Sequence, residues 1–205
     1  MKKFFLIPVI SFFIAGAALA QSNLGPEDLV KQTVNEVMAA VKADKSIQAG
    51  DIQHISELVQ EKILPHADFQ RTTRLVMGRN WNKATPEQQQ QITEQFKQLL
   101  IHTYSGAIAQ IRNQTVTYLP YRGQPGDTDA VIRTQVINNG QPIEIDYRLE
   151  KTPAGWKVYD INVLGAWLIQ AYRDQFTQQI SERGVSGLLS FLTERNRQLA
   201  SGTAK

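Results

Sequence analysis

The chain has 205 residues, of which 42% are hydrophobic and 20% charged, with a formal net charge of +3 and no cysteine. This length is sufficient for one substantial hydrophobic core, and the lack of cysteine excludes a fold held together by disulfides. The small net charge excludes the dense basic surface of a nucleic-acid-binding protein, so we expect no nucleic-acid partner.

Residues 1–20 are predicted to be an export signal peptide. Lys2 and Lys3 precede an apolar run, and Ala18-Leu-Ala20 matches the small-x-small pattern of a cleavage site. An uncleaved membrane anchor is the alternative, but the run is short for a membrane span and the polar Gln21 follows it. Cleavage after Ala20 leaves 20 basic against 19 acidic residues, a net charge of +1. We therefore expect a mature protein located in a bacterial periplasm.

The N-terminal part of the mature chain, residues 26–113, is predicted to be helical. Pro26, Asp51 and Asp68 each precede apolar residues at helical spacing. Proline in the first turn and aspartate at the cap both favour a helix start. Gly78 is a typical glycine stop for the helix that begins after Asp68. We therefore expect three helices before the next strong signal.

The segment from Thr85 carries the strongest local signal in the chain. Thr85-Pro-Glu-Gln88 has the residues of a capping box, with proline at the first helical position. An apolar stripe follows at helical spacing and continues to Ile111. It predicts a long helix that ends near Asn113, and its width indicates that the helix crosses the following sheet.

Residues 115–164 are predicted to form an antiparallel sheet. The runs are rich in Val, Ile, Thr, Tyr and Trp, alternate between apolar and polar side chains, and are separated by Gly, Pro and Asn. A sheet with one apolar face needs helices packed over it. The four expected strands are Thr115–Leu119, Ala130–Ile137, Ile143–Glu150 and Trp156–Leu164.

The C-terminal part, residues 165–200, predicts further helices. Gly184 interrupts the apolar pattern and indicates a helix stop and restart, and residues 201–205 are expected to be a frayed tail. Residues 21–200 are thus predicted to be a single α+β domain. A curved antiparallel four-stranded sheet would be covered by about six to seven helices, in a cone-like arrangement with an apolar cavity between sheet and helices.

No convincing catalytic or metal-binding constellation is evident in the sequence. His54, His66 and His102 lack the spacing of a paired metal motif, and we expect no metal and no cofactor. Asp146 and Asp160 lie on predicted strands, where a carboxylate in an apolar cavity can act as an acid or base. Alternation favours a solvated or cross-strand paired carboxylate at both positions. A small-molecule isomerase or hydrolase using Asp146 or Asp160 is therefore the alternative to a protein without a chemical step.

The aromatic side chains of the sheet and of the covering helices leave two interpretations open. They fill a solid core, as in a structural or adaptor protein, or they line a concave apolar site. A wall residue and a core residue look identical in sequence, so the pattern alone does not separate the two.

A series of motifs runs in one order through nearly all of the mature chain. The motifs are Leu75-Val-Met-Gly78 with Trp81, Ala84-Thr-Pro-Glu-Gln88, Phe96, Leu99-Leu100 with Tyr104, Val131 to Thr134, Ile145-Asp-Tyr-Arg148, Trp156-Lys-Val-Tyr-Asp160 with Gly165, Tyr172-Arg173 with Phe176, and Gly184 with Leu188. In this order they resemble the MlaC family of periplasmic phospholipid-binding proteins, also called the toluene-tolerance family.

The resemblance implies a soluble carrier that holds a phospholipid by its tails between sheet and helices. It would shuttle the lipid between an outer-membrane lipoprotein–porin complex and an inner-membrane ABC transporter complex, maintaining outer-membrane lipid asymmetry. Arg148 or Arg173 is a candidate to meet the lipid phosphate. The family usually has a Glu-Gly-Val-Ser-like run after the last strand, whereas this chain has Leu164-Gly-Ala-Trp167. The bulky ring of Trp167 stands where a small residue is common, so we expect it to affect the shape of the cavity at that end. The residues expected to line the lipid cavity are Leu75, Trp81, Phe96, Leu100, Tyr104, Ile108, Ile145, Tyr147, Ile161, Val163, Tyr172 and Phe176.

Overall fold

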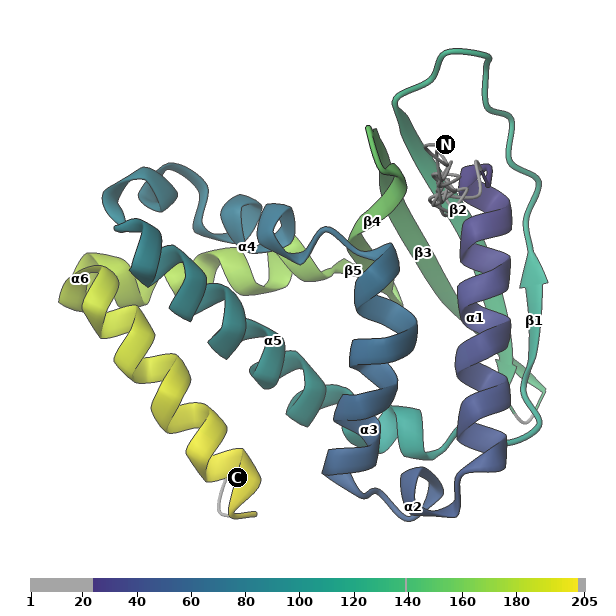
Figure 1. The fold of residues 1–205 in the computed structure, drawn as a ribbon, viewed down its shortest axis with the longest axis horizontal. Helices are drawn as coiled ribbons and strands as arrows, with labels where there is room; N and C mark the ends of the chain where they lie inside the picture. The colour runs from purple at the N-terminus through teal and green to yellow at the C-terminus, as the bar shows by residue number, and fades with distance from the viewer. Residues whose placement is uncertain (1–23, 139, 203–205) are drawn as a thin grey trace, which may run out of the picture.

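The computed structural model describes residues 24–138 and 140–202, so the predicted signal peptide lies outside the described residues. Figure 1 shows a sheet at one end of the molecule, with α1 lying across it, and a layer of helices beside the sheet. The helices within the described ranges are α1 (Pro26–Ala43), α2 (Lys45–Gln48), α3 (Ile52–Leu58), the π-helical η1 (Val59–Ile63), the 3-10 turn η2 (Leu64–His66), α4 (Phe69–Met77), the 3-10 turn η3 (Gly78–Lys83), α5 (Pro86–Ala109) and α6 (Leu168–Ala200).

The sheet is antiparallel, and its strands lie side by side in sequence order. The predicted α+β class is confirmed, but the described residues form five strands rather than four. Leu164 and Gly165 both have positive φ, at 53° and 88°, which turns the chain back so that two more residues pair with β4. The strands are β1 (Thr115–Tyr118), β2 (Asp129–Asn138), β3 (Gln141–Thr152), β4 (Gly155–Val163) and β5 (Ala166–Trp167).

The predicted helix starts are confirmed by cap geometry. The Thr85 hydroxyl accepts from the Gln88 backbone N–H while the Gln88 side chain accepts from Thr85 N–H, which is the expected capping box at the start of α5. Asp51 and Asp68 accept from first-turn N–H groups of α3 and α4. α5 ends at Ala109, so the prediction that it continues to near Asn113 is wrong by about one turn.

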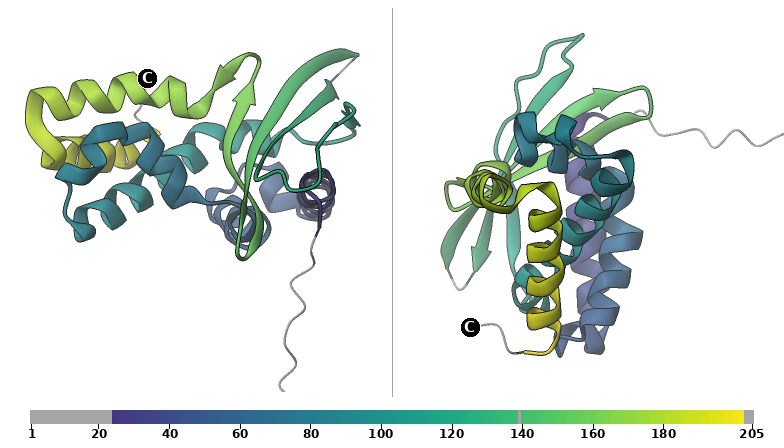
Figure 2. Two further views of the ribbon diagram at one scale, coloured as in Figure 1. Left: turned by 90° about the horizontal axis from the view of Figure 1, so that it is seen from above. Right: turned by 90° about the vertical axis from the view of Figure 1, so that its left-hand side faces the viewer.

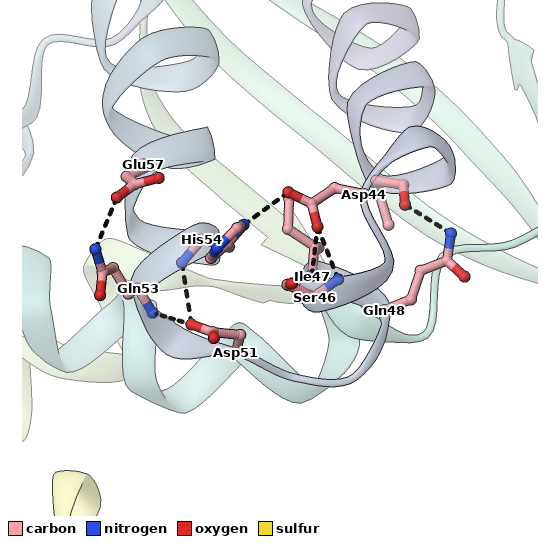
Figure 3. A network of polar contacts seen from close by, with 9 residues as sticks. Asp44, Ser46, Ile47, Gln48, Asp51, Gln53, His54 and Glu57 are labelled. Carbon is pink, nitrogen blue, oxygen red and sulfur yellow. Dashed lines mark hydrogen bonds and ion pairs between the residues drawn. The ribbon is translucent and has the colours of Figure 1, made fainter.

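The short helix α2 was not predicted, and a carboxylate network explains why it forms. Asp44 Oδ1 accepts from the backbone N–H groups of Ser46 and Ile47, at 2.7 and 3.2 Å. Asp44 Oδ2 contacts His54 Nδ1 at 2.8 Å, so one carboxylate caps α2 and ties it to α3 (Figure 3). Gln48 then donates to carbonyls at the C-terminal end of α1, which closes the connection.

The Asp44–His54 pair predicts a pH-dependent contribution to stability. The hydrogen bond with Asp44 raises the pKa of His54, and the same bond with His54 lowers the pKa of Asp44. The His54 contribution is therefore fully present below its ordinary pKa and is lost as pH rises through its raised folded-state pKa. The Asp44 contribution is present above its ordinary pKa and is lost as pH falls through its lowered folded-state pKa.

We expect His54→Asn to lower the melting temperature at about pH 5.5 and to have much less effect at about pH 8.5. His102→Asn serves as a matched control for loss of an imidazole from a helix. The measurement is thermal unfolding followed by circular dichroism across this range. A loss that is equal at both pH values would contradict an electrostatic role for the pair.

Buried side chains form three separate clusters. The α6 core joins α4, η3, α5 and α6 around Phe96 and Phe176, both fully buried. The central core joins α1, α2, α3, η1 and α5 around Val41, Ile55 and Ile101. The sheet core packs α1 against β2 and β3 through residues that include Leu29, Val30, Ala130, Ile132 and Leu149. Separate cores leave room for a hollow where they meet.

Helix α6 reverses direction at Gly184, whose φ of 69° and ψ of −175° are not helical. The predicted stop and restart at this glycine is therefore confirmed, and Figures 1 and 2 show the second half of α6 returning along α5. The turn brings Leu188 and Leu192 into the α6 core, where both are fully buried. In the described part of the chain, the helices are too short or too polar to span a bilayer.

Candidate functional site: an apolar cavity beside β4

A cavity of about 230 Å³ lies between β4 and the helices. Leu100, Tyr104 and Ile108 follow one another at four-residue spacing along one face of α5, and Ile161 and Val163 alternate along β4. The walls are almost entirely apolar. The complete lining is Val59, Ile63, Leu64, Ala67, Phe69, Thr72, Lys97, Leu100, Ile101, Tyr104, Ile108, Val158, Tyr159, Asp160, Ile161, Val163 and Leu168.

The cavity lies where the three cores meet. Phe69 and Leu100 also pack against the α6 core, Val59 and Ile101 belong to the central core, and Val158 packs against the sheet core. No single core fills the space because each packs around its own centre. The wall formed by η1 is π-helical, a distortion that is frequent at functional sites.

The start of α4 is fastened to β4 on one side of the cavity. The backbone N–H of Asp68 donates to Val158 O at 2.8 Å, and the Thr72 hydroxyl donates to Tyr159 O at 2.6 Å. On this side β4 pairs with the short β5 and, through a single bridge at Val158, with Ala67, so these bonds satisfy carbonyls at an edge that no long strand covers. They hold the wall residues of α4 and β4 at a fixed separation.

For Asp160, alternation predicted a solvated or cross-strand paired carboxylate. The cross-strand pair is present, with Arg148 directly opposite on β3, but the side chain is 0% exposed because α6 begins beside this part of β4. Asp160 Oδ1 accepts from the backbone N–H groups of Ile161 and Ile169, at 3.0 and 3.1 Å, so it caps α6 from another element. Asp160 Oδ2 accepts from Arg148 Nη1 at 3.1 Å. Burial raises the pKa of Asp160, and the backbone N–H groups of Ile169 and Ile161 together with Arg148 oppose that rise.

Asp146, the other carboxylate considered for catalysis, lies outside the cavity wall. It pairs in register with Arg133 of β2, and burial raises its pKa while the Arg133 charge opposes that rise. The two carboxylates therefore do not meet in one site. Among residues 24–138 and 140–202, no three His, Cys, Asp or Glu side chains are grouped closely enough to hold a metal ion.

Of the twelve residues predicted to line the cavity, Leu100, Tyr104, Ile108, Ile161 and Val163 lie in its wall. The other seven lie elsewhere in this structure. Five belong to the α6 core or pack against it, namely Leu75, Trp81, Phe96, Tyr172 and Phe176. Tyr147 packs against the sheet core, and Ile145 is half-buried on β3 opposite Val163. Leu75 also lines a separate groove between α4 and α6.

This second hollow, the basic groove, is open to the surface and larger, at about 650 Å³. Four cations line it without any carboxylate: Arg74, Arg79, Lys83 and Arg173. It shares no lining residue with the apolar cavity. Since charged side chains make a poor surface for hydrocarbon, the smaller apolar cavity is the better candidate for a lipid tail.

Sequence reasoning missed wall residues from η1, η2 and the start of α4. Val59 and Ile63 belong to the apolar pattern predicted for the second helix, but the π-helical turn that aims them at the cavity has no sequence signal. Leu168 was part of the predicted apolar pattern of the last helices. Trp167 is not a wall residue, because its ring stacks on the Arg148 guanidinium with 3.7 Å from Cζ to the ring centroid.

Comparisons with known proteins find several that are similar to this chain. The chain is 29% identical to the toluene tolerance protein ttg2D of Pseudomonas putida over 160 residues, covering 78% of this chain and 74% of that protein. It is 21% identical to the intermembrane phospholipid transport system binding protein MlaC of Haemophilus influenzae, over 97% of this chain and 95% of that protein.

A solved structure is also similar, that of a phospholipid-binding protein from Ralstonia solanacearum in complex with a phospholipid. It is 54% identical, with a TM-score of 0.85 over 86% of this chain and 99% of that chain. The family model described as "MlaC protein" matches residues 31–194, most of the sequence. This chain therefore belongs to the MlaC family.

Proposed function

We propose that this protein is a periplasmic phospholipid carrier without a chemical step. It would take lipid from one membrane complex and deliver it to another, between an outer-membrane lipoprotein–porin complex and an inner-membrane ABC transporter complex. The observation that carries the proposal is the apolar cavity between β4 and α5, in a chain 54% identical to a structure with bound phospholipid. The predicted signal peptide of residues 1–20 supports the periplasmic location.

The free energy of exposing lipid tails to water makes an apolar cavity the minimum that a lipid carrier requires. Exposing roughly thirty methylenes of a two-tailed lipid to water costs on the order of 20 kcal/mol, at about 0.8 kcal/mol per methylene. A carrier replaces the hydrocarbon of the bilayer during transit and does not need to bind more tightly than the bilayer. Apolar walls satisfy that requirement without any reactive group.

The cavity must widen to receive two full acyl chains. Its volume of about 230 Å³ lies below the range of about 300–1,000 Å³ that is common for sites of drug-sized ligands. The wall residues come from the edges of three cores, so the cavity can widen through shifts of these edge side chains while the centre of each core stays packed. Side chains at the inner edge of the α6 core, such as Tyr172, would then join the wall, as the sequence predicted.

Lipid extraction tests the proposal directly. The protein is purified from periplasm, extracted with organic solvent and analysed by mass spectrometry. We expect phospholipid at close to one molecule per chain. Protein that is purified without bound lipid and also takes up none from phospholipid vesicles would overturn the proposal.

The enzymatic alternative depends on Asp160, because only this carboxylate of the two reaches the cavity. Both of its oxygens are occupied by Ile161, Ile169 and Arg148, which leaves no oxygen without a protein partner. A structural role as a helix cap accounts for these contacts. We therefore expect Asp160→Asn to retain bound phospholipid. Turnover of a small-molecule substrate that is lost in this variant, with no lipid found in the protein, would instead favour catalysis.

A further inference from the structure

We propose that the basic groove between α4 and α6 is a second ligand site, which binds a phosphate-bearing anion. This inference goes beyond the proposed function, because the groove shares no lining residue with the apolar cavity. Neither Arg148 nor Arg173, the two arginines expected to meet a lipid phosphate, lines that cavity. Arg173 instead lines the basic groove, together with Arg74, Arg79 and Lys83.

Three neighbouring elements bring these cations together. α4, η3 and the first half of α6 pack side by side (Figure 1). Gly78, with φ of 55° and ψ of −135°, ends α4 and turns the chain, so that Arg74 before it and Arg79 after it line one groove. On the α6 side, Arg173 and Thr177 lie one helical turn apart on the same face. An anion in the groove would therefore meet positive charge from both sides.

The positive charge of the groove is not neutralised within the described part of the chain. Arg74 and Arg79 are exposed, and they form no ion pair and no side-chain hydrogen bond with another described residue. Asp174 and Glu182, which lie next to groove residues on α6, do not line the groove. Elsewhere in residues 24–138 and 140–202, other cations do pair with carboxylates, namely Lys31, Arg71, Lys97, Arg148 and Arg197. Unpaired cations gathered in a hollow attract an external anion.

The other two cations of the groove are held in place by neutral oxygens. Lys83 Nζ donates to Asn80 Oδ1 at 2.8 Å, and Arg173 Nη2 donates to Leu75 O at 3.1 Å. Neutral acceptors orient these side chains without cancelling their charge. Arg173 uses one nitrogen in this bond, so its guanidinium keeps further N–H groups that can donate to a phosphate oxygen.

A buried amide adds a further donor. Asn80 lines the groove and is only 7% exposed. Its Oδ1 accepts from Lys83, whereas its Nδ2 donates to no acceptor among the residues that the structure describes. A buried N–H group without an acceptor is costly, so Asn80 favours a ligand that supplies an oxygen.

Phosphate is the anion that this set of donors fits best. The N–H groups of an arginine match two oxygens of one phosphate, and Asn80 and Thr177 add neutral donors beside them. The groove is a hollow of about 650 Å³, which suits a headgroup or a small solute. The phosphate can belong to the headgroup of an anionic phospholipid or to a soluble phosphate compound, and these two sources behave differently in binding experiments.

Binding is measured by isothermal titration calorimetry at low salt, with inorganic pyrophosphate as the probe and protein purified with its bound lipid. We expect one saturable site per chain, whose affinity falls as salt is added because the cations are exposed. The double variant Arg74→Gln with Arg79→Gln is expected to weaken binding by about tenfold or more. Since neither arginine has a partner in the described chain, this variant is expected to fold normally.

The matched control is the double variant Arg122→Gln with Lys151→Gln. It also removes two exposed positive charges, but neither residue lines the groove, so it is expected to bind pyrophosphate as wild type does. Asn80→Asp places a carboxylate in the groove with almost no change in shape, and its oxygen can still accept from Lys83. It is expected to weaken binding by about tenfold or more, while circular dichroism checks that it is folded.

Vesicle flotation separates the two sources of phosphate. Phosphatidylcholine vesicles are compared with vesicles that also contain the anionic lipid phosphatidylglycerol. For a lipid headgroup, wild type is expected to float with the anionic vesicles, pyrophosphate to release it, and the Arg74→Gln, Arg79→Gln variant to stay unbound. For a soluble phosphate compound, wild type is expected to bind pyrophosphate but neither kind of vesicle.

Several results would overturn the site. Wild type that binds neither pyrophosphate nor anionic vesicles would do so, as would equal affinities for wild type and the Arg74→Gln, Arg79→Gln variant, or an equal loss in the control. A glutamate-rich peptide that binds more tightly than pyrophosphate would assign the groove to an acidic protein partner instead. Failure of the proposed function is a separate result, because wild type would then yield no phospholipid on extraction, whether or not it binds pyrophosphate.

Discussion

Replacing Phe96 with alanine is expected to lower the free energy of unfolding by about 3–5 kcal/mol. Phe96 is fully buried, and its ring centroid lies 5.4 Å from that of Phe69 and 5.0 Å from those of Tyr172 and Phe176. Removing the ring loses three aromatic contacts and leaves a cavity where α4, α5 and α6 meet. Native domains have free energies of unfolding of only about 5–15 kcal/mol, so this loss is a large fraction of the total stability.

The measurement is urea unfolding of delipidated protein, because bound lipid would add its own stabilisation. Phe96→Leu is the matched control, since it keeps an apolar side chain and is expected to lose clearly less stability. A loss below about 1 kcal/mol for the alanine variant would show that the α6 core repacks around the gap.

Replacing Tyr104 with glutamate is expected to reduce phospholipid occupancy by about tenfold or more while leaving the fold largely intact. Tyr104 lies in the cavity wall and is half-buried, so the carboxylate can stay hydrated when no lipid is bound. A bound acyl chain would remove that water and leave the charge unpaired against hydrocarbon. The glutamate therefore destabilises the lipid-bound protein more than the lipid-free protein.

Occupancy is measured by extraction and mass spectrometry, and folding by circular dichroism. Tyr104→Phe is the matched control, because it preserves the apolar ring and is expected to keep the wild-type occupancy. Unchanged occupancy in the glutamate variant would show that Tyr104 does not contact the lipid. Equal loss of lipid and of folded protein would assign Tyr104 to the core.

Local signals made much of the fold predictable. Thr85 and Asp68 satisfy backbone N–H groups within their own first turns, so a few neighbouring residues determine each helix start. The strands followed from alternation in the same way. α2 escaped prediction because its four residues are too few to show a helical period, although Asp44 caps it through the neighbouring N–H groups of Ser46 and Ile47.

The site was less predictable because its walls depend on tertiary packing. Ile161 and Val163 were found by alternation. Alternation also allowed Asp160 its cross-strand partner Arg148, but it did not predict that the start of α6 buries this carboxylate. Phe96 and Tyr104 belong to one apolar stripe of α5, yet one fills a core and the other lines the hollow. Sequence periodicity identifies a buried face, and only the neighbouring elements decide whether that face meets a side chain or a void.

The reversal at Gly184 has a consequence for how copies of this protein can associate. A residue with a side chain disfavours the positive φ found there, so substitution favours a continuous helix of 33 residues, about 50 Å long. Leu188 and Leu192 would then project beyond their own molecule. The same leucines of a second copy would fit the site they vacate in the α6 core, so we expect glycine at this position to disfavour exchange of the C-terminal arm between copies.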